Sequence, residues 1–398
     1  MLLAHKVQLY PTAAQAEYLR RCCGARRYAY NALLAYFKEP GVKWSKAAAY
    51  AYFIAQVRQP WMTELTSRAP RNAIDDLDTG FKHFFRRVKA GQRPGFPTFH
   101  KHGVDDSFSL REKPKFAVSG RKLRLEKAPG LIRMRQALRF EGTPCSVTVS
   151  HRAGKFYAAI VVETNYSRPA PSEDVVGVDF GVSALATFSN GEVVPANQKL
   201  KANLRRLKRK QRNLSRKQPK SNRRAKAKLA VAKLHKRVAD QRRAVLHETS
   251  DTLTRRFKAV IIEDLAVKNM VNNRKVSRAI SDAGLGTLRA MVEYKAVLRG
   301  CDVVVAPRFY PSSKTCSACG EVKTDLALSE RIFRCEHCDL EIDRDLNAAR
   351  NLESLHTLTA DSKRAQEFGK TASNGGTNVD GAKMITTTTD CVDYRKHL

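Results

Sequence analysis

The stretch CSACGEVKTDLALSERIFRCEHCDLEIDRDLNAARN, residues 316–351, contains two CxxC pairs followed by the acidic start of a helix. The four cysteines are Cys316, Cys319, Cys335 and Cys338. Each CxxC turn can aim two thiolates at one point, and the hairpin between the pairs brings the turns together around a tetrahedral zinc ion. Two disulfides are the alternative, but they need an oxidising compartment, and the opening MLLAHKVQLYP has no secretory signal. The spacing therefore predicts one structural zinc ion.

Basic residues dominate the charge of the chain. Its 398 residues include 73 Lys and Arg against 38 Asp and Glu, a formal net charge of +35. Such an excess would repel itself without a polyanionic partner, and it indicates a protein that binds nucleic acid. A membrane surface is the competing partner, but no apolar run approaches the roughly 20 residues that span a bilayer. The length allows roughly two to four domains.

The first part of the chain reads as a strand, a helical region and a set of short strands. Residues 1–10 alternate in polarity like an edge strand, and Thr12 and Gln15 then form a capping box that starts a helix. Helical patterning continues to about residue 90. From Gly95 to about residue 168, short apolar runs broken by Gly, Pro and Lys predict a small β-barrel or sandwich, which the first strand could join.

A different pattern opens at residue 175 and predicts a mixed α/β domain. VVGVDFG (175–181) is a buried strand with Asp179 near its carboxyl end, and an Asn190-Gly191 turn joins the next two strands. KAVIIEDL (258–265) and CDVVVAPRFYP (301–311) are two further strands. The last helix opens at the DRDLNAARN run.

Residues 199–243 carry twenty Lys or Arg against one Asp, a pattern that predicts a basic helical hairpin. Pro219 separates its two helices, whose apolar stripes would pack together. The stripes are Leu200, Leu204, Leu207 and Leu214 in the first helix and Val231, Leu234, Val238 and Val245 in the second. The residues expected to meet nucleic-acid phosphates are Arg205, Arg206, Lys208, Arg209, Lys210, Arg223 and Arg224. A merely solvated charged face is the alternative.

Three acidic residues occupy positions where rigid elements could bring them together. Asp179 and Glu263 end two buried strands that could lie side by side, and Asp345 opens the last helix. Such carboxylates could hold two divalent cations about 4 Å apart for phosphodiester cleavage, and hard oxygen ligands favour Mg²⁺ or Mn²⁺. Asp343 is the second candidate in that helix. Taken singly, each acid could instead cap a helix or end a strand.

These segments resemble those of the TnpB family, transposon-encoded RNA-guided nucleases of the OrfB type that are similar to the type V CRISPR effectors. The resemblance rests on motifs in the family's order: GFPTF (95–99), GVDFG (177–181), IIEDL with NMVNNRKVSRAISDAG (261–284), PSSKTCSACG (311–320) and DRDLNAARN (343–351). Four of the five motifs are spread over residues 173–357, and the N-terminal half resembles the family more loosely.

The resemblance implies a RuvC-like nuclease domain of the RNase H fold, within a multidomain chain of α/β and α+β parts. The catalytic, metal-binding acids would be Asp179, Glu263 and Asp345, because the family's pattern of acid, any residue, Asn, Ala matches at Asp345. The implied domains are a wedge-like β-barrel (1–10 and 105–172), a helical recognition lobe (11–104), the nuclease domain (173–308 and 340–358), an inserted zinc ribbon that binds target nucleic acid (309–339) and a disordered tail (359–398).

The function implied by the resemblance is RNA-guided cleavage of DNA. A transposon-derived guide RNA would pair with one strand of a double-stranded DNA target beside a short motif, while the protein grips backbones and hydrolyses phosphodiesters with two Mg²⁺ ions. A DNA transposase that uses the same carboxylates, and a DNA-binding regulator of transposition that never cuts, are the alternatives. The expected location is the cytoplasm of a prokaryotic cell, in association with the nucleoid.

Overall fold

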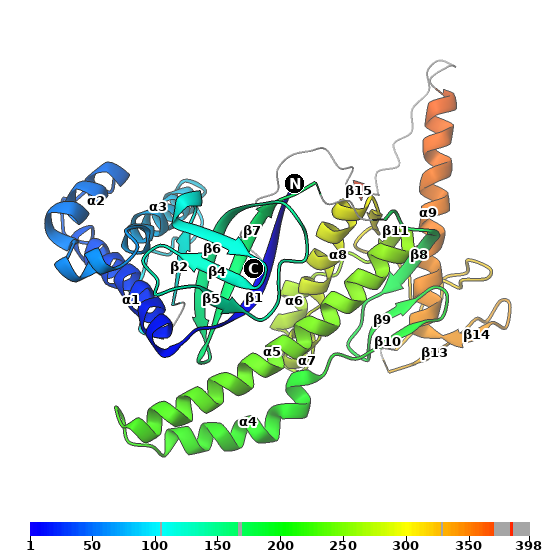
Figure 1. The fold of residues 1–398 in the computed structure, drawn as a ribbon. Coiled ribbons are helices and arrows are strands. Elements are labelled where there is room, and N and C mark those ends of the chain that lie inside the picture. The colour runs from blue at the N-terminus through cyan, green and yellow to red at the C-terminus, as the bar shows by residue number, and fades with distance from the viewer. Residues whose placement is uncertain (104–105, 166–168, 328, 370–382, 385–398) are drawn as a thin grey trace. The chain divides into compact units, whose positions relative to one another are not determined.

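The computed structural model describes residues 1–398 apart from 104–105, 166–168, 328, 370–382 and 385–398 (Figure 1). The chain divides into two compact units, Met1–Tyr166 and Ser167–Leu398. Across the described ranges, no helix is both long enough and apolar enough to cross a membrane.

The first unit is built on a seven-stranded antiparallel sheet with the order β2-β6-β7-β1-β5-β4-β3. Its strands are β1 (Leu2–Tyr10), β2 (Ser107–Leu110), β3 (Phe116–Ser119), β4 (Lys122–Leu125), β5 (Ile132–Met134), β6 (Thr143–Arg152) and β7 (Lys155–Glu163). Phe108, Val149 and Ile160 are among the buried side chains of its core. The sequence does not predict β3 and β5, because runs of three or four residues give too weak an alternation signal.

The sequence predicts an edge strand for residues 1–10, but β1 lies inside this sheet. It pairs antiparallel with β7 from Leu2 opposite Glu163 to Leu9 opposite Phe156, and its last residues pair with β5. Val7 and Leu9 are buried on one face. The alternation of polarity therefore reflects one packed and one open face, which an interior antiparallel strand can also have.

The helices of the first unit are α1 (Ala13–Tyr36), α2 (Lys46–Tyr52) and α3 (Arg68–Lys89), with short turns η1 (Phe53–Val57), η2 (Pro60–Glu64) and η3 (Lys113–Lys115). The predicted capping box is confirmed, because the Thr12 hydroxyl accepts from the N–H of Gln15 and the Gln15 side chain accepts from the N–H of Thr12. α1 and α3 share a core that contains Leu33, Leu34 and Leu77.

The second unit contains a mixed sheet, in agreement with the predicted mixed α/β order. Its strands are β8 (Glu173–Asp179), β9 (Ala184–Phe188), β10 (Val193–Pro195), β11 (Phe257–Ile262), β12 (Asp302–Val305) and β15 (Lys383–Met384). They follow the order β10-β9-β8-β11-β12-β15, in which β9 is antiparallel to β8 while β8, β11 and β12 run parallel. The predicted turn joins β9 to β10, and Gly191 in it has a φ of +91°.

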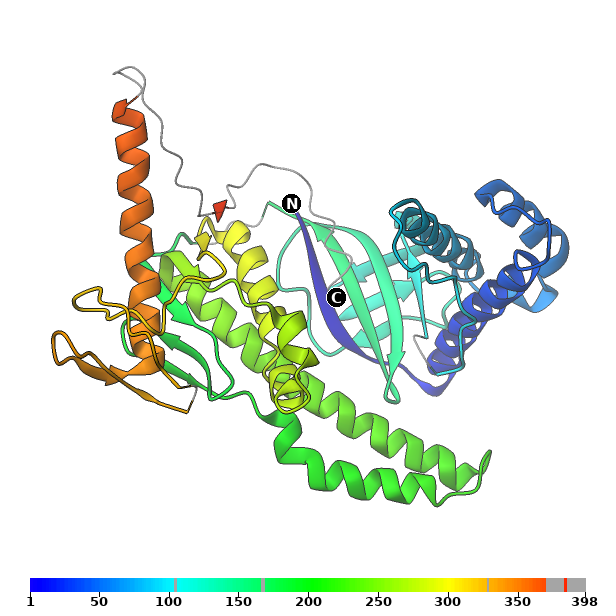
Figure 2. The same cartoon turned by 180° about the vertical axis from the view of Figure 1, so that it is seen from behind.

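Helices cover both faces of this sheet. The helices of the second unit are α4 (Lys199–Ser215), α5 (Asn222–Arg256), α6 (Val267–Asn272), α7 (Ser277–Ala283), α8 (Leu285–Arg299) and α9 (Arg344–Gly369). Ile262 packs in a core with residues of α5 and α8, whereas its neighbour Ile261 packs with Leu352 of α9. Both views accordingly show α8 and α9 on opposite sides of the sheet (Figures 1 and 2). Because β11 is buried on both faces, its sequence reads as a continuous apolar run.

The predicted basic hairpin is formed by α4 and α5, which lie side by side and project from the sheet in both views (Figures 1 and 2). Leu207, Leu234 and Val238 are buried where the two helices meet. The Ser221 hydroxyl caps α5 by accepting a 3.1 Å hydrogen bond from the N–H of Arg224. Leu200 and Val231 pack against this cluster, so five of the eight predicted stripe residues meet there, whereas Val245 packs against the core of the sheet.

Two elements differ in length from the sequence-based expectation. The strand expected over 301–311 is limited to β12, because Pro307 and Pro311 lack the N–H donors that a strand needs. In the cysteine-rich region, β13 (Ile332–Arg334) pairs with β14 (Glu341–Asp343), so that hairpin extends past residue 339 and leads directly into α9.

The C-terminal boundary also differs. The sequence predicts a disordered tail over 359–398, whereas α9 continues to Gly369 and β15 pairs with β12. Intrahelical hydrogen bonding can extend a helix through polar sequence once packing has fixed its start. The rest of the predicted tail, 370–382 and 385–398, lies outside the described residues.

Candidate active site

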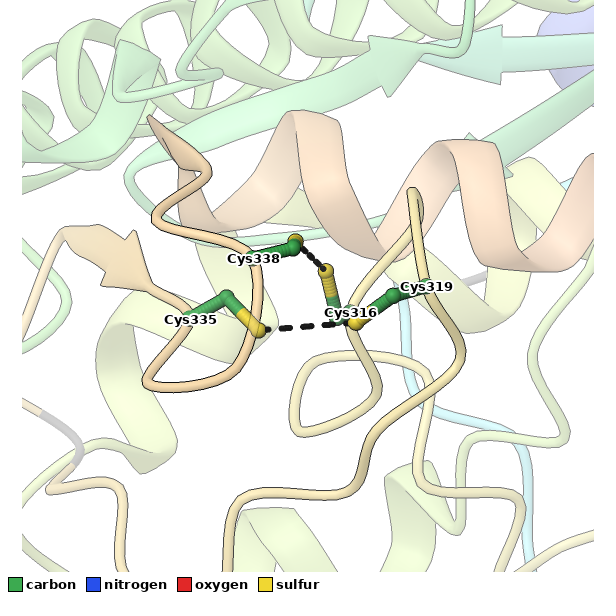
Figure 3. Close-up of side chains that lie close together, drawn as sticks. All are labelled: Cys316, Cys319, Cys335 and Cys338. Atoms are coloured by element: carbon green, nitrogen blue, oxygen red, sulfur yellow. Dashed lines mark hydrogen bonds between the residues drawn. The ribbon is translucent and has the colours of Figure 1, made fainter.

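Four cysteine thiols converge as the CxxC spacing predicts (Figure 3). Cys316 and Cys319 lie in one turn after β12, and Cys335 and Cys338 lie in the β13–β14 hairpin. The Sγ atoms of Cys316 and Cys338 are 3.6 Å apart, those of Cys319 and Cys335 also 3.6 Å, and all four lie within 4.8 Å of one another. Sulfurs about 2.3 Å from a central zinc ion would be roughly 3.8 Å apart, so the quartet fits tetrahedral zinc.

The hairpin also activates one of these thiols. The backbone N–H groups of His337 and Cys338 lower the pKa of the Cys335 thiol to about 6. This lowering favours the thiolate form of Cys335, which is the form that binds metal. Phe333, buried beneath Cys316 and Cys335, forms the apolar base of the cluster.

Asp179 and Glu263 are brought to the same edge of the sheet. Asp179 is the last residue of β8, and Glu263 directly follows β11. These strands are parallel neighbours in which Val178 stands opposite Ile262, so the two acids occupy adjacent positions at the carboxyl ends. Asp345 lies in the first turn of α9.

The negative charges of Glu263 and Asp345 both act on the carboxyl group of Asp179. Burial raises the pKa of Asp179 well above its usual range, and the negative charges of Glu263 and Asp345 raise it further. The guanidinium of Arg344 opposes this shift. The carboxylates are nevertheless spaced more widely than the thiols, because the cysteine quartet is the only group of three or more possible ligands within 4.8 Å among the described residues.

Asp343 and Asp345 have different surroundings. One carboxylate oxygen of Asp343 accepts hydrogen bonds of 3.0 Å from the N–H groups of Asp345 and Leu346. Asp343 thus caps α9 and satisfies donors that the helix start would leave unpaired. This cap favours Asp345 over Asp343 as the acid available to a ligand.

Glu263 and Asp264 also differ, although they are adjacent. Glu263 accepts a short hydrogen bond from the Ser312 hydroxyl. Asp264 forms ion pairs of 2.7 Å with Arg289 and with Arg308, which hold the pKa of its carboxyl below the usual range. Asp264 therefore links α8 to the loop after β12 through these two ion pairs, whereas Glu263 lies next to Asp179.

Two asparagines attach the first cysteine turn to α9. The Asn347 side chain accepts from the N–H of Ser317 at 2.9 Å and donates to the carbonyl of Thr315 at 2.7 Å. Asn351, one helical turn later, donates to the carbonyls of Ser312 and Thr315. Sequence reasoning missed these positioning residues and Ser312; the i, i+4 spacing of the two asparagines in DRDLNAARN was the available signal.

Gly177 allows α9 to approach β8 closely. A Cβ atom at this position would lie 1.9 Å from the carbonyl oxygen of Ala349 and 2.5 Å from the nitrogen of Glu353. No side chain larger than hydrogen fits there. The first glycine of the GVDFG motif therefore sets the distance between the strand of Asp179 and the helix of Asp345.

The predicted basic residues occupy different surroundings on the hairpin. Arg205, Lys208 and Arg209 help to line an open basic cavity of about 620 Å³ along α4, together with Arg212, Asn213, Arg216 and Lys217. Arg206 and Lys210 are not among its lining residues. Arg223 is exposed, and Arg224 donates to the carbonyls of Leu214 and Lys217, so it closes the turn between the helices.

Known proteins resemble the chain along most of its length. The family model OrfB_IS605, described as "Probable transposase", matches residues 157–274, and a "Cas12f1-like, TNB domain" model matches 286–352. A "Putative RNA-guided DNA endonuclease" of Streptomyces pristinaespiralis is 35% identical over 360 residues, which covers 88% of each chain. The chain belongs to the TnpB family. The "Putative RNA-guided DNA endonuclease InsQ" of Escherichia coli K12 is 32% identical and covers 88% of this chain and 91% of its own.

Other proteins are similar to this TnpB chain at lower sequence identity. The "CRISPR-associated endodeoxyribonuclease Cas12f1" of Sulfoacidibacillus thermotolerans is 28% identical over 217 residues, half of each chain. The cryo-EM structure of a Cas12f1-sgRNA-target DNA complex covers 89% of this chain and 99% of its own with a TM-score of 0.33 and 14% identity, which is too low to define the fold. A "Helix-turn-helix domain" model matches residues 1–40, where this TnpB chain has β1 and the single long helix α1.

Proposed function

We propose that the chain is an RNA-guided DNA endonuclease encoded by a transposon, which cleaves target DNA next to a short motif. The observation that carries this proposal is the meeting of Asp179, Glu263 and Asp345 at one sheet edge. Family membership, relatives named as RNA-guided endonucleases and a net charge of +35 support the same reading.

We further propose that residues 173–308 and 340–358 form a RuvC-like domain of the RNase H type, with the zinc ribbon 309–339 inserted in it. The support is the order of a three-stranded antiparallel part, β10-β9-β8, continued by the parallel strands β11 and β12. Asp179 ends β8, Glu263 follows β11 and Asp345 lies in the first turn of α9, so three separate elements would supply one ligand each.

The acidic cluster suits two Mg²⁺ or Mn²⁺ ions. Oxygen-only ligands favour these hard cations, and phosphodiester cleavage by metal ions uses two of them about 4 Å apart. When bound, the cations stabilise the charge that develops on the phosphate during hydrolysis. Asp179, Glu263 and Asp345 would hold the cations, whose charge would offset the repulsion among the three carboxylates, and Ser312 donates a hydrogen bond to Glu263.

The cysteine quartet is proposed to hold one structural zinc ion. The side chains of Asn347 and Asn351 attach the first cysteine turn to α9, so a rigid cluster would fix the start of the helix that carries Asp345. The same ribbon is proposed to contact target nucleic acid. Zinc would therefore act on cleavage through the position of Asp345, without taking part in the chemistry.

The remaining parts are proposed to bind the partners, a transposon-derived guide RNA and double-stranded target DNA. Residues 11–104 would form a recognition lobe, and 1–10 with 105–172 a wedge-like barrel. The basic residues of α4 and of the start of α5 would grip phosphates, because twenty cations against one Asp need a polyanion. The site of action would be the nucleoid in the cytoplasm of a prokaryotic cell.

The proposal is tested with the protein purified together with its RNA. Asp179→Ala should abolish Mg²⁺-dependent cleavage of a matched DNA target and leave RNA and DNA binding nearly intact. Asp174→Ala is the matched control, because this exposed Asp on the same strand pairs only with Lys258 at the surface. Full cutting by Asp179→Ala would exclude the assigned site.

A transposase that performs strand transfer with the same acids is the second candidate, because the matching family model is described as "Probable transposase". The products discriminate between the two. Cleavage that follows the guide sequence favours the nuclease, and joining of transposon ends to target DNA without added RNA favours the transposase.

A further inference from the structure

The loop 307–312 is hydrogen-bonded at two points to Glu263 and Asp264, the two acids that directly follow β11. Arg308 donates two hydrogen bonds, of 2.7 and 2.9 Å, to one carboxylate oxygen of Asp264. Ser312 donates to Glu263. Between these contacts the N–H of Tyr310 donates to the carbonyl of Pro307 and makes a tight turn. Phe309 therefore lies, along the chain, between two residues whose side chains are hydrogen-bonded to Asp264 and Glu263.

Phe309 contributes almost nothing to the packing of the folded chain. Its exposed fraction is 91%, whereas no other large apolar side chain of the described residues exceeds the 62% of Leu2. A single exposed apolar side chain is ordinary on a protein surface, so exposure alone decides nothing. The position of Phe309 in the chain is more informative than its exposure. Three residues of extended chain reach at most about 10 Å, so the Cα atom of Phe309 lies within that distance of the Cα atom of Ser312, whose hydroxyl donates to Glu263.

We propose that Phe309 stacks on an unpaired nucleobase of the DNA strand that lies across Asp179, Glu263 and Asp345. This inference rests on the proposed nuclease function and adds a positioning residue to it. Stacking on the base next to the scissile phosphate would set which phosphodiester reaches the carboxylates. The partner is single-stranded because both faces of a base inside a duplex are already covered by its neighbours.

The chemistry of the side chain suits this role. A phenyl ring stacks on any base and reads no hydrogen-bond pattern, so it positions a strand without adding sequence preference. Such indifference fits an enzyme whose specificity comes from pairing with a guide. Arg308, the neighbouring residue, pairs with Asp264 but keeps 57% of its side chain exposed, so its guanidinium remains accessible to a strand phosphate.

The test uses the full chain with its RNA and a DNA target that carries 2-aminopurine at positions around the cut. The wild type should quench the fluorescence of one such position and cut at a defined bond. Phe309→Ala and Phe309→Leu should lose the quenching, cut on the order of tenfold more slowly and spread the cut over several bonds. Phe309→Trp should retain quenching and position, because it keeps an aromatic face whereas leucine keeps only apolar volume.

Val193→Ala is the matched control, since it trims a side chain that is 58% exposed in β10 of the same unit and should change none of these readouts. Equal zinc content and unfolding temperature of all variants exclude a structural cause. Phe309→Ala that quenches and cuts like the wild type would overturn the inference while the nuclease assignment stands. If the wild type cuts no target, the proposed function fails, and the difference in quenching between wild type and Phe309→Ala still decides the stacking.

Discussion

At the scale of single residues, Asp179 determines the electrostatics of the site. The fold partly buries this carboxyl and places two further acids near it, so that the charged form of Asp179 is disfavoured. Such an arrangement costs stability in the absence of cations, and stored repulsion of this kind is typical of functional sites. Activity and stability should therefore respond in opposite directions when Asp179 is neutralised.

Asp179→Asn should raise the unfolding temperature in chelator at neutral pH by roughly 2–4 °C, the shift given by 1 kcal/mol in a unit of this size. The folded protein keeps the Asp179 proton to higher pH than the unfolded chain, so the wild type loses stability as pH rises from the usual carboxyl pKa to the raised one. The advantage of the variant should thus grow over that interval and vanish in acid. Thermal melts across pH measure it, and a variant less stable than the wild type at neutral pH would contradict the account.

Residue identities were predictable only where a pattern points at them. Asp179 and Glu263 could be named because each ends an apolar run, and the cysteines because their spacing suits one metal. Asn347, Asn351 and Ser312 could not be assigned, because their roles depend on hydrogen bonds to segments that only the folded chain brings near.

At the scale of elements, the position of α9 relative to β8 decides whether Asp345 meets Asp179. Gly177→Ala should destabilise the protein by about 1–3 kcal/mol, because the added methyl group overlaps the Ala349 carbonyl. Cleavage should fall with it, since α9 must move outward. Gly286→Ala in α8 is the control: its Cβ would meet only Val267 at 3.8 Å, so it should be neutral. Chemical denaturation and cleavage rates test the pair, and an unaffected Gly177→Ala would mean that α9 packs less closely.

The cysteine-rich hairpin should hold α9 through zinc. Cys335→Ser should remove the bound zinc, measured by elemental analysis, and lower cleavage, whereas Cys145→Ser should keep both because that thiol lies outside the cluster. In the wild type, zinc loss to a chelator should increase as pH falls, because protons compete with zinc for the four thiolates. Unchanged zinc in Cys335→Ser would count against the site.

Elements with strong periodicity were predictable, and short ones were not. The α4–α5 hairpin follows from its apolar stripes, and the β9–β10 turn from Asn190 and Gly191. The interior place of β1 depends on pairing with β7, more than a hundred residues away, which no local pattern encodes. The lengths of β12 and α9 likewise depend on prolines and packing beyond the local apolar run.

At the scale of the whole molecule, the charge of +35 is the property that implies a polyanionic partner. Replacing Arg205 and Arg209, which line the basic cavity, with Gln should reduce the salt dependence of RNA binding by a slope of about 1.5–2, if each contacts one phosphate. Arg206 and Lys210 on the same helix provide a charge-matched pair outside the cavity, and their replacement should cost less. Equal slopes for both pairs would show that the cavity has no special role.

The mixed α/β order, the nucleic-acid partner class and the four-cysteine cluster could be predicted from sequence, because motif order, composition and spacing each constrain them. The division into units at Tyr166 could only be approximated. Domain limits depend on which segments pack together, and the composition changes gradually there.

The most direct measurement is cleavage by the purified protein after exchange of the guide segment in its copurifying RNA. The account predicts that the cut moves to the DNA that matches the new guide, requires Mg²⁺ and is lost in Asp179→Ala. Cleavage that ignores the guide, or that persists without Asp179, would contradict it.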